Sequence, residues 1–154
     1  MGLRDFEILL DTGILSTEEG ISDETRRILA EEDFTEIVSI KKETILVEQG
    51  TRPEALFFTI DGKFHAISHA NPDAPNRLLG RIGEGQFIGE VCLVDPTSKA
   101  SATVKALPDS MVLKMKPEAF ESLCKSHPVA ANEFLLSVAR QLAKRLREAN
   151  ERVL

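Results

Sequence analysis

Closely spaced glycines divide the middle of this sequence into short apolar runs. The runs at residues 56–60 and 64–68 both contain Phe and Ile. Glycine permits the backbone conformations that tight turns require, and short apolar runs between turn residues are typical of antiparallel barrels and sandwiches. The glycines that separate the runs are Gly50, Gly62, Gly80, Gly83, Gly85 and Gly89. Since apolar and polar residues begin to alternate at about Ile37, we expect strands from there.

Segments with helical periodicity flank this region on both sides. Before it, Phe6, Leu9 and Leu10 recur at helical spacing, and Ser22 is positioned as the N-cap of a further helix. After it, Pro117 opens a short helix. A longer helix follows, with an apolar stripe made of Leu135, Val138, Leu142, Leu146, Ala149 and Val153. We therefore expect one α+β domain over residues 1–154, with N-terminal helices at 1–35, strands at 36–116 and C-terminal helices at 117–154.

The composition is that of a globular, soluble chain. Hydrophobic residues make up 42% of the sequence and charged residues 29%, which is enough apolar material for one core. The net charge of −6 argues against a basic face that binds nucleic acid. Cys92 and Cys124 are the only cysteines, so we expect free thiols and no disulfide. The sequence has no signal-peptide pattern and no membrane-spanning run, and we expect a cytoplasmic location without membrane contact.

Two neighbouring segments carry the chemistry. Residues 85–93 read Gly-Gln-Phe-Ile-Gly-Glu-Val-Cys-Leu, and residues 100–104 read Ala-Ser-Ala-Thr-Val. A glycine-rich turn that leads into a short helical segment exposes backbone N–H groups to an anionic phosphate. A carboxylate beside that turn can accept a hydrogen bond from a sugar hydroxyl.

These segments resemble the phosphate-binding cassette of the cyclic nucleotide-binding domain family. The family pattern runs Gly-x-x-Phe-Gly-Glu-(Leu/Ile/Val)-x-Leu and then, after a short loop, Arg-(Ser/Thr/Ala)-Ala-x-Val, and the sequence matches most of it. Residues 47–50, residues 56–62 and the two C-terminal helices also resemble the family, so the resemblance covers nearly the whole chain. It implies an antiparallel β-roll of the catabolite activator protein and protein kinase A regulatory subunit type, a jelly-roll-like double-stranded β-helix flanked by helices.

The resemblance also implies roles for individual residues. Glu90, which follows Gly89, is expected to accept a hydrogen bond from the ribose 2′-hydroxyl, and backbone N–H groups are expected near the phosphate. The full set of expected ligand-binding residues is Gly89, Glu90, Val91, Cys92, Lys99, Ala100, Ser101, Ala102 and Thr103.

One position departs from the family pattern. Ala100 stands where the family has an arginine that pairs with the cyclic phosphate. Lys99 is one residue earlier, but lysine is a point charge without the bidentate fork of arginine. Because a charge-assisted hydrogen bond contributes roughly 1.5–3 kcal/mol, its loss predicts cAMP or cGMP affinity that is lower by about tenfold to a hundredfold.

Two functional interpretations follow from the resemblance. The first is a non-catalytic regulatory or sensory module that binds cAMP, cGMP or a related anionic ligand and signals through movement of the C-terminal helices. The second is a degenerate member of the same fold that does not bind nucleotide and acts as a dimerisation or protein-interaction module. The apolar stripe of the last helix predicts a homodimer. We expect no DNA-binding domain, because no residues follow that helix to form a helix-turn-helix.

An enzyme is the remaining alternative. His65 and His69 would share one face of a strand, as metal ligands of a cupin do, but the cupin motif needs His-x-His and a downstream Glu. No Ser-His-Asp or Cys-His arrangement is visible, and we interpret Cys92 as a small core residue. We therefore expect no catalytic residue, no metal and no cofactor. The basic residues of the last helix are interpreted as its solvated face rather than a nucleic-acid patch: Arg140, Lys144, Arg145 and Arg147.

Overall fold

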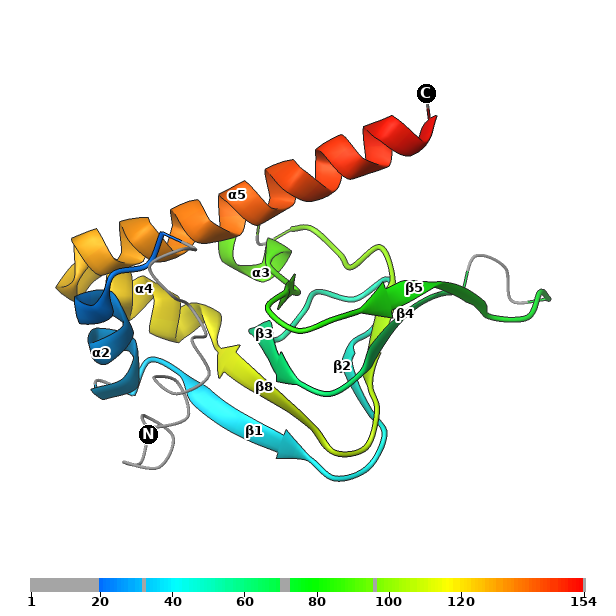
Figure 1. The fold of residues 1–154 in the computed structure, drawn as a ribbon, viewed down its shortest axis with the longest axis horizontal. Coiled ribbons are helices and arrows are strands. Elements are labelled where there is room, and N and C mark those ends of the chain that lie inside the picture. The colour runs from blue at the N-terminus through cyan, green and yellow to red at the C-terminus, as the bar shows by residue number, and fades with distance from the viewer. Residues whose placement is uncertain (1–19, 32, 70–72, 96, 154) are drawn as a thin grey trace.

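The strands form two four-stranded antiparallel sheets (Figure 1). The computed structural model describes residues 20–31, 33–69, 73–95 and 97–153. In the first sheet the order is β1 (Glu36–Ile40), β8 (Ser110–Met115), β3 (Leu56–Asp61) and β6 (Phe87–Ile88). In the second it is β2 (Thr44–Val47), β7 (Thr103–Ala106), β4 (Phe64–Ser68) and β5 (Arg77–Ile82). The predicted antiparallel β-roll is confirmed, while the helix expected around Phe6, Leu9 and Leu10 lies outside the described residues.

A two-residue turn carries the chain from the first sheet to the second. Gly62 in this turn has φ +105°, and a Cβ there would lie 2.6 Å from the Ser110 Cα, so no other residue fits without a shift. The Lys63 N–H donates a hydrogen bond of 3.2 Å to the Ser110 hydroxyl. The turn is thereby fixed against the start of β8.

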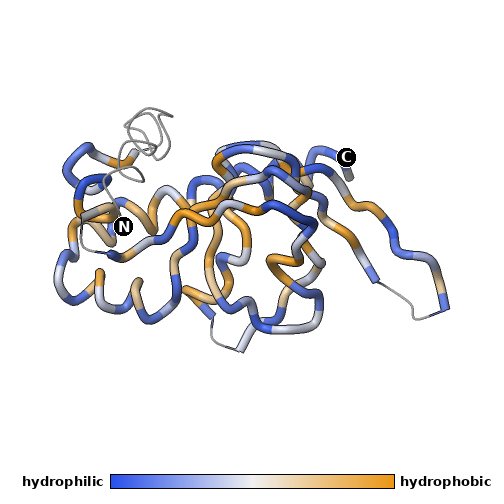
Figure 2. Tube along the Cα trace, turned by 90° about the horizontal axis from the view of Figure 1, so that it is seen from below, coloured by the Kyte–Doolittle hydropathy of each residue, from blue (hydrophilic) through white to orange (hydrophobic). Residues whose placement is uncertain are grey.

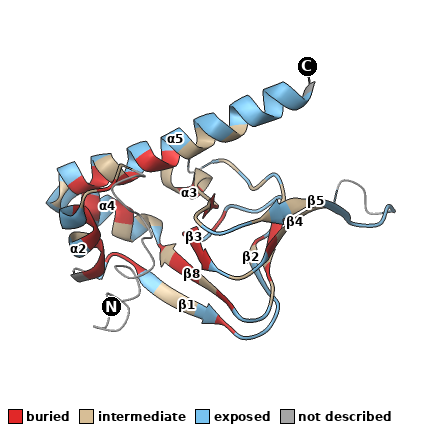
Figure 3. Cartoon of the chain, in the orientation of Figure 1, coloured by how far each residue is buried: buried red, intermediate tan, exposed pale blue. Residues whose placement is uncertain are grey.

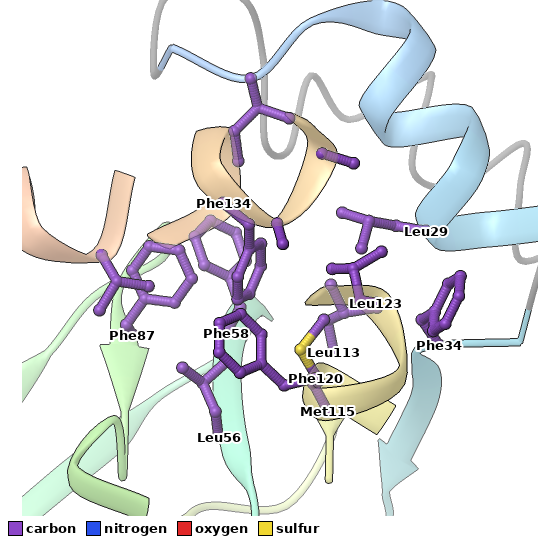
Figure 4. Close-up of a cluster of buried hydrophobic side chains, with 14 of the residues drawn as sticks. Leu29, Phe34, Leu56, Phe58, Phe87, Leu113, Met115, Phe120, Leu123 and Phe134 are labelled. Carbon is purple, nitrogen blue, oxygen red and sulfur yellow. The ribbon is translucent and has the colours of Figure 1, made fainter. Parts of the chain in front are cut away.

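Helices cover the first sheet through a core of aromatic and aliphatic side chains (Figure 4). The Phe58 and Phe87 rings meet edge to face with centroids 4.9 Å apart, and Phe87 meets Phe134 in the same way at 5.7 Å. Such aromatic pairs contribute about 0.5–1.5 kcal/mol beyond their burial. Phe134 belongs to α5 (Pro128–Val153), so this core joins the roll to the C-terminal helix.

A second core lies on the other face of the first sheet. Phe57 belongs to this core, whereas the adjacent Phe58 belongs to the first, as the two-residue period of a strand requires. Phe64 from the second sheet is fully buried in the same core. The first five residues of strand β3 are therefore buried on both faces, and Thr59 is the one polar residue among them.

The other helices are α2 (Asp23–Glu31), α3 (Val91–Val94) and α4 (Pro117–Ser126). The Thr25 N–H donates a hydrogen bond of 3.3 Å to the Ser22 hydroxyl, which is the expected N-cap contact at the start of α2. The Glu133 carboxylate on α5 accepts hydrogen bonds from the Ser22 N–H, at 3.1 Å, and from the Thr25 hydroxyl. These contacts join α2 to α5.

The last part of α5 extends beyond the helices it packs on, and most of its residues are exposed (Figure 3). The β4–β5 hairpin also projects from the body, and the described residues from 73 to 77 are mostly hydrophilic (Figure 2). Among the described residues, no helix has the length and apolar character needed to cross a bilayer.

Candidate functional site: a pocket between the roll and the C-terminal helix

A pocket of about 590 Å³ lies where the turn from β6 to α3, the loop at residues 98–102 and α5 come together. In Figure 1, α3 lies directly below α5. The expected ligand-binding residues that line this pocket are Gly89, Glu90, Val91, Lys99, Ala100, Ser101 and Ala102. Cys92 and Thr103 from the same predicted set do not line it.

Gly89 forms the turn that leads into α3. Its φ of +74° lies in the left-handed region, and a Cβ there would come within 2.8 Å of the Ala55 carbonyl oxygen. Any side chain at this position is therefore strained and crowded. The turn presents Glu90, the residue that immediately precedes α3, to the pocket.

The Glu90 carboxylate faces a guanidinium from α5. The Arg145 Nη1 lies 3.6 Å from the Glu90 Oε1, and the Glu90 side chain is only 16% exposed. At this distance the pair is an ion pair without a direct hydrogen bond. A small polar group of a ligand therefore finds a carboxylate acceptor and a guanidinium donor next to each other.

Hydrogen bonds hold α5 to the strand that precedes this turn. Gln141 donates to the Gly85 carbonyl oxygen at 2.9 Å and accepts from the Phe87 N–H at 2.6 Å. The Arg145 Nη2 donates to the Phe87 carbonyl oxygen and, at 2.7 Å, to the Gln141 side-chain oxygen. Two side chains one helical turn apart thus connect α5 to the residues just before Glu90.

The prediction of a solvated basic face is wrong for Arg145. This side chain is 35% exposed and lines the pocket, whereas Arg140, Lys144 and Arg147 are exposed as expected. The spacing of four residues between Gln141 and Arg145 was the available signal. This spacing indicates a role in the pocket only in combination with the packing of α5 against Phe87.

The loop that carries Ala100 is fixed by its backbone. The Ala100 N–H donates to the Thr51 carbonyl oxygen at 2.8 Å, and the Gly50 N–H donates to the Ala100 carbonyl oxygen at 2.9 Å. Thr103 is 1% exposed, and its hydroxyl accepts a hydrogen bond of 3.0 Å from the Gln49 N–H. In this structure Thr103 supports the loop rather than the pocket wall.

Three basic residues line the pocket, and Glu90 is the single acidic residue among the described residues of its wall. Arg81 comes from β5, Lys99 from the loop before β7 and Arg145 from α5. The pocket therefore has the charge that suits an anionic ligand, although Ala100 contributes none.

Cys92 belongs to the core, as expected. It is 3% exposed, and its N–H donates to the Gly89 carbonyl oxygen at 3.2 Å. Burial raises the pKa of the Cys92 thiol to about 11, so it is protonated at neutral pH. In the described part of the chain, His, Cys, Asp and Glu side chains form no group of three that is suited to a metal ion.

The chain belongs to the cyclic nucleotide-binding domain family. The family model described as "Cyclic nucleotide-binding domain" matches residues 37–127, which include the turn at Gly89 and the loop at Ala100. Domains of this family are regulatory modules that bind a small ligand, and the fold and pocket described above agree with that assignment.

Relatives and solved structures agree with the assignment. The Pycsar effector protein PaPycTIR of Pseudomonas aeruginosa is 32% identical over 148 residues, which are 96% of this chain and 43% of that protein. The Pycsar effector protein BcPycTIR of Burkholderia cepacia is 31% identical over 119 residues, 77% of this chain and 36% of that protein. The chain thus spans less than half the length of either relative.

The structural matches cover most of the chain. A cyclic nucleotide-binding domain from Methylobacillus flagellatus superposes with a TM-score of 0.79 at 20% identity, covering 97% of this chain and 83% of that one. The catabolite activator protein of Thermus thermophilus gives a TM-score of 0.67 at 25% identity, covering 87% and 59%.

Proposed function

We propose that this chain is a non-catalytic sensor that binds a 3′,5′-cyclic nucleotide in the pocket beside α5. The contact between Glu90 and Arg145 carries the proposal, because it links the expected ribose-binding carboxylate to the helix that would transmit the signal. Glu90 accepts the ribose 2′-hydroxyl, and the turn at Gly89 and the loop at Ser101 and Ala102 surround the phosphate.

The pocket supplies positive charge without the arginine that the family has at the Ala100 position. Lys99, Arg81 and Arg145 line the same cavity as Ser101 and Ala102. Their field favours an anion over a neutral nucleoside, although none replaces the bidentate contact of the missing arginine. We therefore expect the nucleotide to bind in preference to the uncharged nucleoside, with modest affinity.

The signal passes to α5. A hydroxyl that donates a hydrogen bond to the Glu90 carboxylate competes with Arg145 for it. Arg145 also bonds to the Phe87 carbonyl oxygen, and Gln141 accepts a hydrogen bond from the Phe87 N–H. Ligand binding therefore changes the contacts that hold α5 to the roll. A ligand shifts such an equilibrium only through its differential affinity for the two states, and this competition supplies that difference.

The curated relatives are named effector proteins, and this chain matches less than half of each. We infer that the sensor controls an activity carried by another part of a larger protein or by a partner, and that it acts in the cytoplasm without contacting nucleic acid or membrane. Adenine and guanine nucleotides are not distinguished by any contact described above.

A second candidate function is a dimerisation module that binds no nucleotide. Ala100 favours it, and so does an apolar seam on α5 made of Leu135, Ala139, Leu142, Leu146 and Ala149. Leu135 is 37% exposed and Leu146 64% exposed, although both are large and apolar. The alternating three- and four-residue spacing of the seam is that of a two-stranded coiled coil. A homodimer through α5 is compatible with either function.

Thermal unfolding with and without ligand tests the proposal. Cyclic 3′,5′-nucleotides with each of the four bases are compared with the linear 5′-monophosphates by calorimetry, because the chain has no Trp or Tyr. A cyclic nucleotide at about 100 times its Kd stabilises the fold by about 2.7 kcal/mol and raises the Tm by roughly 5–10 °C. If no cyclic nucleotide shifts the Tm, the sensor function is wrong and the dimerisation module takes its place.

A further inference from the structure

A second cavity adjoins the proposed ligand pocket at the end of β5. It has a volume of about 470 Å³, and we call it the basic recess. Lys63, from the turn between the two sheets, lines it together with His65 of β4 and Arg81 of β5. Phe64, Ile82 and Leu107 form its apolar part, and no Asp or Glu is among the described residues that line it.

The basic side chains of the recess lack a counter-charge in the described part of the chain. Among the residues that the structure describes, Lys63, His65 and Arg81 form no ion pair. Arg81 lies directly opposite His65, and His65 lies directly opposite Lys105 of β7, so a basic row crosses three strands. Within this row, Lys105 has an acidic neighbour, Glu43 at 3.9 Å. Directly opposed basic residues destabilise a sheet, and in a chain with a net charge of −6 this row stands out.

The donor set defines the ligand class. Lysine and arginine are donors only, and a histidine ring presents an N–H in either protonation state. Three donors that line one cavity, without a carboxylate among the described lining residues, suit an oxyanion, and an arginine fork matches the geometry of phosphate. We propose that the basic recess is a second anion-binding site that takes a phosphate-type oxyanion.

The recess shares a wall with the ligand pocket. Arg81, Ile82 and Gly83 line both cavities. An anion that draws the Arg81 guanidinium into the recess removes it from the pocket, so the two sites compete for one cation. This coupling rests on the proposed function, whereas the second site itself does not. By linkage, phosphate then lowers the affinity for the cyclic nucleotide, and the nucleotide lowers the affinity for phosphate by the same factor.

A titration with inorganic phosphate, followed by ¹H–¹⁵N NMR without nucleotide, tests the site. We expect the amide signals of Gly62, His65 and Gly83 to shift and saturate with a Kd on the order of 1–10 mM. Sodium chloride at equal ionic strength is the reference. Lys63→Gln and His65→Gln, singly and together, are the test variants, and Lys125→Gln, an exposed lysine of α4, is the matched control. Because neither Lys63 nor His65 lines the ligand pocket, these variants leave nucleotide binding unchanged.

The possible results of this titration distinguish a specific second site from nonspecific binding. A saturating shift that the double variant weakens at least about tenfold, and Lys125→Gln does not, supports the second site. Shifts that chloride reproduces, shifts confined to residues 89–102, or equal weakening by Lys125→Gln overturn it. If His65→Gln does not fold, Lys63→Gln alone must weaken binding several-fold. Phosphate binding without any nucleotide binding would support the second site and refute the proposed function. Nucleotide binding without phosphate binding at the recess would refute the second site and support the proposed function.

Discussion

The Arg145 guanidinium lies 3.6 Å from the Glu90 carboxylate, and this pair joins the last helix to the turn that lines the candidate ligand pocket. The two residues are far apart in sequence: Glu90 lies in the turn before α3, and Arg145 lies in α5. A change at either one is therefore expected to affect both ligand binding and the position of α5.

Glu90→Gln is expected to weaken cyclic nucleotide binding by about tenfold to a hundredfold, because the amide replaces a charged acceptor of the ribose hydroxyl. Isothermal titration calorimetry gives the affinity, with Glu121→Gln on the exposed face of α4 as the control. A 2′-deoxy ligand should bind the Glu90→Gln variant and the parent chain with nearly equal affinity. If the variant binds the ribose ligand as well as the parent does, Glu90 has no role in ligand recognition.

Arg145→Gln is expected to loosen the end of α5. The variant loses the charge-assisted bond to the Phe87 carbonyl oxygen and the ion pair to Glu90. Because Arg145 is partly exposed, we expect a modest effect, with amides at residues 141–152 exchanging about tenfold faster by hydrogen–deuterium exchange. Arg147→Gln, an exposed neighbour, should leave exchange unchanged. Equal acceleration by both variants would assign the effect to net charge.

Ala100→Arg is expected to raise cAMP or cGMP affinity by about tenfold or more, since it restores the phosphate contact of the family pattern. Ser122→Arg adds the same charge on the exposed face of α4 and serves as the control. Affinity measured for both variants in two salt concentrations separates a direct contact from a general field. No gain over Ser122→Arg would count against our position for the phosphate.

Gly89→Ala is expected to destabilise the fold by about 1–3 kcal/mol, because the residue has φ +74° and the new Cβ would crowd the Ala55 carbonyl. Gly80→Ala is the matched control, since nothing lies within 4 Å of a Cβ there. Urea unfolding followed by circular dichroism gives both values. Similar stability of the two variants would show that the turn relaxes freely.

Cys124 is expected to react with a thiol reagent at pH 8 while Cys92 does not. Cys124 is exposed, and the raised pKa of Cys92, about 11, leaves almost none of the reactive thiolate at that pH. Mass spectrometry should find one labelled thiol in the folded chain, two after denaturation, and none in folded Cys124→Ser. Rapid labelling of Cys92 in the folded chain would indicate frequent opening of the core around α3.

Much of the fold follows from local sequence patterns. Glycines at turns, apolar runs such as β3 and β4, and the two-residue periodicity of β1 predict the strands, and the Ser22 N-cap marks the start of α2. The turn at Gly89 followed by Glu90 predicts the pocket wall. Turns, caps and strand periodicity are determined by residues close together in the sequence, so local sequence patterns are enough to predict them.

The α5 side of the pocket was not predicted. Arg145 was interpreted as part of a solvated face and Gln141 was not singled out, because their backbone partners are more than fifty residues away in sequence. Likewise, Thr103 matched a binding motif but bonds to Gln49, a pairing that depends on how two loops meet. The contacts of Gln141, Arg145 and Thr103 depend on how elements distant in sequence pack together. The periodicity of the sequence carries no information on that packing.

Phe87 belongs both to the wall of the pocket and to the hydrophobic core. It lines the candidate ligand pocket, its ring packs between Phe58 and Phe134, and its main chain forms hydrogen bonds with Gln141 and Arg145. A densely packed interior does not deform gradually, so a ligand that displaces Phe87 must drive the aromatic cluster from one packing arrangement to another. The response of α5 is therefore expected to be a switch between two discrete positions. The free energy that a ligand must supply is then set by the packing of the three phenyl rings.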